Sequence, residues 1–331
     1  MAFLHNYKNS DEVNHKMKYT VVVDSVAAIP EFIFKSRPIK VLPISINING
    51  EVKPEIVDEK ELIEYYKSGE LTVHTKIKTA PPSPEQITDF ILNEVAPYSD
   101  FALCQTFSKA ASPIYDNFEK AASSIAKRSR EVRDGLGIEQ PFRMTYLNTG
   151  TGIAAQGLVA IYADMLLSRG ADVQEYTDTM EKFTRVIRSY AIVRDIYYSR
   201  QRALEKGIKS VGLAPALLGK AVGLTPIIEN YGDQSGPVVT KRSEEKALES
   251  LIRYAIDRVK DGLYVPIVNI SYAGDLDDIY AMPLIQELKD EAKKKKIQVL
   301  FGVMKLGSSM MYGPGGFSIG LAPKNNKAKP E

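Results

Sequence analysis

Cysteine, tryptophan and histidine are almost missing from this sequence. It has one cysteine, Cys104, no tryptophan, and three histidines, His5, His15 and His74, all in the first quarter of the chain. One cysteine excludes a disulfide framework and any multi-cysteine zinc or iron–sulfur site. A histidine-based triad would have to use one of those three imidazoles. We therefore predict no metal site and no catalytic residue of the common hydrolase or redox classes.

The sequence also lacks an excess of one charge and a long apolar run. Its 331 residues carry 43 Lys and Arg against 41 Asp and Glu, a net charge of +2, which gives no electrostatic signal for nucleic acid. No apolar run approaches the ~20 residues that span a bilayer. Met1 to Tyr19 is charged and polar, unlike a secretory signal. Together with the single thiol, these features predict a cytoplasmic protein without a membrane span.

Patterns typical of strands and helices alternate through the first half of the chain, which predicts an α/β domain with a doubly wound, mostly parallel sheet. The first strand is the β-branched run Tyr19–Asp24, and a second β-rich block runs from Ile39 to Ile48, before the turn Asn49-Gly50. The further elements expected here are strands at 101–104 and 144–147 and helices at 59–68, 112–133, 153–168 and 172–187.

The second half predicts a mixed α/β domain. Strands at 226–228 and 238–240 flank the turn-rich Asn230–Gly236 as in a hairpin. Helices are expected at 243–260 and 276–295, and strands at 264–271 and 297–304, before a glycine-rich tail. The length is that of a two-domain protein. We predict an N-terminal extension at 1–18, domains at 19–175 and 176–323, and a polar, frayed C-terminal tail at 324–331.

Polar clusters follow several predicted strands, where α/β sheets carry their sites. Asp24-Ser25 either caps the next helix or places a hydroxyl in a cleft. The loop Lys78-Thr79-Ala-Pro-Pro-Ser83 opens a helix, so it is either a rigid capped loop or a place for an anionic group near a helix N-terminus. A third cluster, Thr106 to Tyr115, offers three hydroxyls, of which Ser112 is a natural N-cap.

Two segments rich in small residues lie in the second half. Gly307 to Gly320 is dense in glycine, which permits close backbone approach, but it lacks the Gly-Lys-Ser/Thr ending of a nucleotide phosphate loop. Leu213 to Leu224 is apolar and glycine-punctuated, and it could form either ordinary core or the wall of an apolar tunnel.

Taken in order, these motifs resemble the DegV family of bacterial fatty-acid-binding proteins. Strand-Asp24-Ser25 ending at Pro30 is similar to the family's Thr-Asp-Ser-x-x-x-(Leu/Ile)-Pro. Thr79-Ala-Pro-Pro-Ser83 resembles its Thr-Ser-Gln-Pro-Ser loop, and Ser112-Pro-Ile-Tyr115 stands where Ser-Gly-Thr-Tyr is usual. The segments 41–50, 224–228 and 312–320 are similar to three further family motifs, so the resemblance extends over about residues 19 to 321.

The resemblance implies a two-domain fold that binds a long-chain fatty acid in a tunnel at the domain junction. It implies no catalytic residue and no cofactor, with the bound acid presented to a separate kinase subunit. By position, Thr79 and Ser112 become the head-group residues, and Asp24, Ser25 and Gly313 fall in family motifs near them.

Three positions depart from the family pattern. Lys209 is the nearest cation to the family's arginine, Met311 stands in place of a histidine, and Ala80 replaces the second residue of the Thr-Ser pair. Lysine lacks the two-pronged donor geometry of arginine. We therefore predict a divergent member whose ligand is less acidic or whose kinase coupling is lost. The residues leave two other functions open, an enzyme acting on a small acyl or phosphorylated substrate and a degenerate protein-interaction scaffold.

Overall fold

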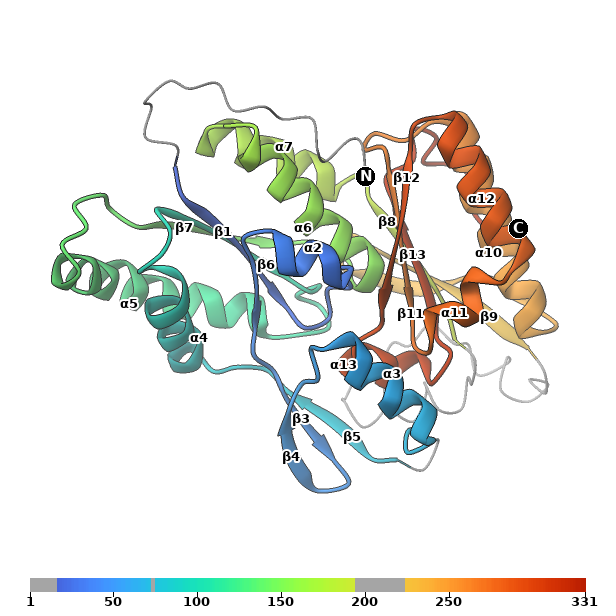
Figure 1. Ribbon diagram of the computed structural model, residues 1–331, viewed down its shortest axis with the longest axis horizontal. Helices are drawn as coiled ribbons and strands as arrows, with labels where there is room; N and C mark the ends of the chain where they lie inside the picture. The colour runs from blue at the N-terminus through green and yellow to red at the C-terminus, as the bar shows by residue number, and fades with distance from the viewer. Residues whose placement is uncertain (1–16, 73–74, 194–223) are drawn as a thin grey trace.

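The computed structural model describes residues 17–72, 75–193 and 224–331. In this part of the chain, two large sheets lie side by side with helices around and between them, and a small third sheet projects at the bottom of Figure 1. The α/β fold predicted from the sequence is therefore confirmed. No helix among these residues is both long and apolar enough to cross a membrane. Lys209 and Leu213 to Gly223 lie outside the described residues.

The first large sheet is four-stranded and wholly parallel, in the order β2-β1-β6-β7. Helices cover both of its faces, which explains why β1 and β6 are buried along nearly their whole length. The strands are β1 (Tyr19–Asp24), β2 (Ile39–Leu42), β6 (Phe101–Thr106) and β7 (Arg143–Asn148), and the helices are α2 (Glu31–Ser36), α4 (Pro84–Phe90) with its continuation η1 (Ile91–Val95), α5 (Ile114–Gly135), α6 (Ile153–Ser168) and α7 (Val173–Thr184).

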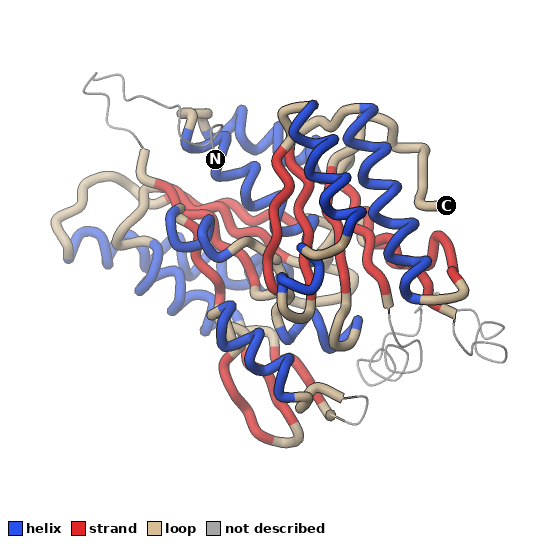
Figure 2. The backbone as a smooth tube through the Cα atoms, turned by 45° about the vertical axis from the view of Figure 1, so that its right-hand side comes forward, coloured by secondary structure: helices blue, strands red, loops and turns tan. Residues whose placement is uncertain are grey.

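The second large sheet is six-stranded and mixed, in the order β10-β9-β8-β13-β11-β12. Only its β11 and β12 pair in parallel. The strands are β8 (Arg188–Ile192), β9 (Thr225–Tyr231), β10 (Gln234–Lys241), β11 (Ile267–Tyr272), β12 (Gln298–Val303) and β13 (Phe317–Leu321), and the helices are α10 (Glu244–Asp261), α11 (Leu276–Tyr280), α12 (Pro283–Lys294) and α13 (Leu306–Tyr312). Figure 2 shows α10 and α12 packed together on the outer face of this sheet.

The small third sheet is antiparallel, in the order β4-β3-β5, and packs with α3 (Glu59–Ser68) and α13 around a core of its own. Its strands are β3 (Ser45–Ile48), β4 (Glu51–Pro54) and β5 (Ile77–Ala80). The predicted block Ile39–Ile48 is thus divided between two sheets, because the chain leaves the parallel sheet after Leu42 and turns back at Asn49-Gly50.

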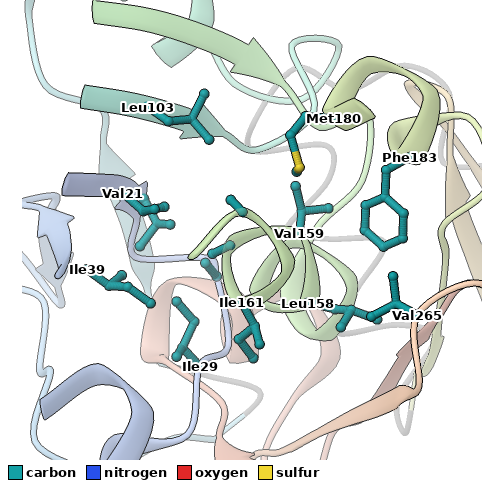
Figure 3. Close-up of a cluster of buried hydrophobic side chains, with 14 of the residues drawn as sticks. Val21, Ile29, Ile39, Leu103, Leu158, Val159, Ile161, Met180, Phe183 and Val265 are labelled. Carbon is teal, nitrogen blue, oxygen red and sulfur yellow. The ribbon is translucent and has the colours of Figure 1, made fainter. Parts of the chain in front are cut away.

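Helix α6 lies between the two large sheets and forms the centre of the molecule. It is buried on almost all sides, which suits a sequence that is apolar all round. Figure 3 shows Val159 facing Met180 of α7, while Leu158 points toward Val265, just before β11. Helix α6 therefore contributes buried side chains to the hydrophobic packing of both large sheets.

Strand β13 passes so close to α6 that only glycine fits at the crossing. A Cβ added to Gly320 would lie 2.4 Å from the backbone nitrogen of Ala155. We expect Gly320→Ala to lower the free energy of unfolding by about 2 kcal/mol, since neither backbone can move aside cheaply. Denaturant unfolding measures the loss. Gly236→Ala in β10 is the matched control, because its added Cβ meets nothing within 4 Å, and an equal loss there would contradict the crowding argument.

Several sequence predictions are wrong in the second half. The single helix expected at 276–295 is two helices, because Pro283 cannot continue α11 and instead begins α12. The glycine-rich tail contains α13 and the central strand β13. The end of the chain is not frayed: Lys329 forms an ion pair with Glu229, and Ser250 donates to the carbonyl of Glu331. The predicted boundary near residue 175 stays a prediction.

Candidate functional site

A cavity of about 790 Å³ opens where strands of the parallel sheet end. Ser25 follows β1, Ser108 follows β6, and Gly150 follows β7, and all three line it. The β9–β10 hairpin, β5 and α13 contribute the other walls. This is the edge where parallel α/β sheets commonly bind ligands, and the volume lies in the usual range for such sites, roughly 300–1,000 Å³.

Thr79 and Ser112 reach this cavity from different elements. Thr79 lies in β5, opposite Ile46 of β3, and Ser112 precedes α5. The prediction that Ser112 is the N-cap of this helix is wrong, because Pro113 takes that position and no side chain caps the first turn. The Ser112 hydroxyl accepts only a long hydrogen bond, 3.4 Å, from the backbone N–H of Ile114. Neither hydroxyl donates to another described residue, so both can bond a ligand.

A buried carboxyl group, Glu55, lies behind one wall. Its oxygens accept hydrogen bonds from the Ser25 hydroxyl at 2.9 Å and from the Gly307 N–H at 3.1 Å. Burial raises the pKa of Glu55 to about 7, although these two donors and the nearby charge of Lys305 act in the opposite direction. Ser25 and Gly307 line the cavity, so Glu55 sets the hydrogen bonding of two lining groups.

A second carboxyl group, Asp233, lines the cavity from the β9–β10 hairpin. It accepts hydrogen bonds from the Ser108 hydroxyl and from the Asn148 side-chain amide, both at 2.7 Å. These contacts join the hairpin of the second sheet to the loop that follows β6 and to the last residue of β7. The polar part of the cavity is therefore built from both large sheets.

Of the predicted site residues, Thr79, Ser112, Ser25 and Met311 line this one cavity. Their separation in sequence is large, and the fold brings them together at the end of the parallel sheet. Lys209 lies outside the described residues.

Asp24, Ala80 and Gly313 are not among the lining residues. The Asp24 carboxyl group is fully buried and accepts from the backbone N–H groups of Val26 and Phe107 and from the Gln156 side chain, so it organises the loops behind the cavity. Ala80 ends β5 with its side chain exposed, and Gly313 is buried at the end of α13, where the backbone has a positive φ of 81°.

Sequence reasoning missed Asp233, Glu55 and Tyr312. The turn-rich segment Asn230–Gly236 indicated a hairpin, but nothing local indicated that its aspartate would reach the loop after β7. Tyr312 lies directly before Gly313, and its hydroxyl accepts a hydrogen bond from the Asn230 side chain at 3.3 Å. Its side chain lines the cavity, which the neighbouring glycine does not.

Comparison with known proteins identifies relatives over nearly the whole chain. The sequence model of one family, described as uncharacterised proteins of the DegV family, matches residues 18–324. A DegV domain-containing protein of Xanthomonas axonopodis pv. citri is 30% identical over 306 residues, which cover 92% of this chain and 98% of the relative. One from Listeria innocua is 25% identical over 253 residues, covering 76% of this chain and 78% of the relative.

Solved structures share the fold. A stearic acid-binding protein from Eubacterium ventriosum superposes with a TM-score of 0.74 at 17% identity, covering 94% of this chain and all of its own. DegV from Bacillus subtilis, described as a fatty acid binding protein, gives a TM-score of 0.72 at 18% identity, covering 93% of this chain and 100% of its own. With the family match over residues 18–324, the chain belongs to the DegV family.

Proposed function

We propose that this chain binds a fatty acid or a related lipid in the cavity and catalyses no reaction itself. The observation that carries the proposal is the make-up of the cavity wall. Apolar side chains such as Ile44, Ile77 and Ile153 share it with the free hydroxyls of Thr79 and Ser112. An acyl chain with one polar end suits a wall with an apolar part and a hydroxyl-bearing part. Transfer of the hydrocarbon chain out of water is favourable, while the polar end needs hydrogen-bond partners.

The size of the cavity and the relatives support the same proposal. A cavity of about 790 Å³ favours a bound small molecule over a role confined to protein contacts. Relatives with the same fold are described as fatty acid-binding proteins. We further propose a kinase subunit as partner, as the family resemblance implies, and a cytoplasmic location, to which the buried and unpaired Cys104 is suited.

The bound ligand itself is the first test. Native mass spectrometry of the purified protein should show an added mass that organic extraction releases as a lipid. Protein that is repeatedly recovered without a lipid, and that takes up neither dodecanoate nor dodecanol on titration, would overturn the proposal.

The polar end of the ligand is tested by the double variant Thr79→Ala, Ser112→Ala. We expect dodecanoate to bind about tenfold more weakly, because two hydrogen bonds are lost, while the thermal midpoint hardly changes. Competition with a fluorescent acyl probe measures the affinity. The matched control is Ser123→Ala, Ser124→Ala on the exposed face of α5. Unchanged affinity in the cavity variant would show that the polar end lies elsewhere.

A further inference from the structure

The hydroxyl of Tyr312 is a hydrogen-bond donor in the wall of the cavity. Its oxygen accepts a hydrogen bond from the Asn230 side-chain amide at 3.3 Å, so its own hydrogen is left for another acceptor. No residue in the part of the chain that the structure describes accepts that hydrogen, and Tyr312 lines the cavity. Burial raises the pKa of this phenol above its ordinary value of 10.0, so the hydrogen stays in place at neutral pH. A bound ligand can therefore accept it.

Tyr312 is better shielded from water than two further donors of this wall. It packs against the apolar cluster that contains Ile153, as Val26 also does. Gln234 and Ser235 line the same cavity, but both are exposed, so water competes for their hydrogen bonds. A hydrogen bond is electrostatically stronger where the surroundings are less polar. A charged ligand therefore gains more from Tyr312 than from these two exposed side chains.

Helix α13 connects Tyr312 with Thr79. The Thr79 side chain lies against the first turn of this helix, where a Cβ added to Gly307 would be 3.4 Å from the Thr79 methyl group. Tyr312 is the last residue of the helix, and its bond with Asn230 joins the helix to the β9–β10 hairpin. One side of the cavity is thus a series of contacts from β5 through α13 to the hairpin.

A second series of contacts connects the same elements through the segment that carries Ser112. Asn117 of α5 donates to the carbonyl of Pro82, just after β5, at 2.9 Å. Ser108 donates to Asp233 of the hairpin at 2.7 Å, and Ser112 lies in the short segment between Ser108 and α5. The two series form a closed ring of contacts. The threonine and tyrosine hydroxyls of the first series and the serine hydroxyl of the second therefore line one enclosed space.

We infer that the Tyr312 hydroxyl donates a hydrogen bond to the carboxylate of the bound fatty acid, as a third donor beside Thr79 and Ser112. The inference rests on the proposed lipid-binding function and names a further residue that binds the polar end. A carboxylate has about four acceptor sites on its two oxygens, so it can accept from all three hydroxyls. The thioether of Met311 has no hydrogen to donate, and the neighbouring phenol supplies one. The cavity is therefore suited to an ionised acid.

The test is the variant Tyr312→Phe, which removes the hydroxyl and keeps the ring with its packing. Calorimetric titration of the lipid-free full chain at pH 8 should show dodecanoate binding roughly 10-fold more weakly or worse, because a hydrogen bond to an ionised acceptor is lost. The ¹³C chemical shift of bound [1-¹³C]dodecanoate should also move, since it reports hydrogen bonding to the carboxylate. Tyr264→Phe, at a residue 56% exposed, is the matched control and should change neither quantity. Thermal unfolding should give the same midpoint for both variants.

Each result supports or overturns the inference. Weaker binding together with a moved carboxylate signal, in Tyr312→Phe alone, supports it. Unchanged affinity, or weaker binding with an unmoved carboxylate signal, overturns it, while dodecanoate bound by the unaltered chain leaves the lipid-binding function standing. If the unaltered chain binds no dodecanoate, the inference is overturned together with the fatty acid as ligand.

Discussion

Asp24→Ala should lower the free energy of unfolding by about 4 kcal/mol, because Asp24 is buried and its loss leaves three hydrogen-bond donors without a partner. The Asp24 carboxyl group accepts from the N–H of Phe107 at 2.6 Å, and from the N–H of Val26 and the side-chain amide of Gln156, both at 3.1 Å. These donors come from the loop after β1, the loop after β6, and α6. Alanine offers no acceptor at this buried position.

Denaturant unfolding at pH 7 measures this loss. Asp24→Asn keeps one acceptor oxygen in the same place and should recover part of the stability. Asp257→Ala on the exposed face of α10 should change the free energy of unfolding by less than ~0.5 kcal/mol. If Asp24→Ala is as stable as the Asp257 variant, the carboxyl group does not hold the loops together.

Glu55 should make the stability of the protein depend on pH, in the direction opposite to that of most carboxylates. Its pKa is raised from the ordinary glutamate value of 4.5 to about 7 in the folded chain, chiefly by burial. The folded state therefore binds the Glu55 proton more tightly than the unfolded state does. The contribution of Glu55 to the free energy of unfolding is thus greatest below pH 4.5 and falls as the pH rises through 7. The loss from this one group is about 3 kcal/mol.

The Glu55→Gln variant isolates that contribution, since glutamine has nearly the same shape and does not titrate. Its unfolding free energy, subtracted from that of the unaltered chain at pH 4, 6 and 8, should shift by about 3 kcal/mol over the series. Asp24, whose pKa is also raised by burial, to about 6, acts in the same direction in both proteins and cancels in the difference. Glu64→Gln, exposed on α3, should give a difference that does not vary with pH. A flat difference for Glu55→Gln would mean that this carboxyl group is hydrated in solution.

The sequence predicts elements well where the signals that form them are local. The helix Glu59–Ser68 has the predicted bounds because Asp58 caps its first turn and Gly69, with φ 74°, ends it. The parallel sheet was predictable from buried, β-branched strands such as Tyr19–Asp24. Strand β13 was not predictable, because Phe317–Leu321 is short, follows several glycines, and is made a strand by its neighbours β8 and β11.

The residues of the candidate site also differ in whether the sequence could predict them. The prediction of Thr79 and Ser112 depended on the order of short motifs along the chain, and both line the cavity. Asp233 reaches the cavity through a contact with Gly150, which is more than eighty residues away in sequence. Glu55 is one of 41 acidic residues, and no neighbour in sequence marks it as buried. Partners of this kind exist only once the sheets have come together.

The position of helix α6 determines how the chain can fold. Because both large sheets bury side chains against this helix, neither sheet can complete its core alone. A fragment that ends near residue 175 would expose the backbone of Ala154 and Ala155, against which Gly320 packs. The predicted boundary divides the sequence but not the core, so the two halves should gain and lose structure together, as a single cooperative unit.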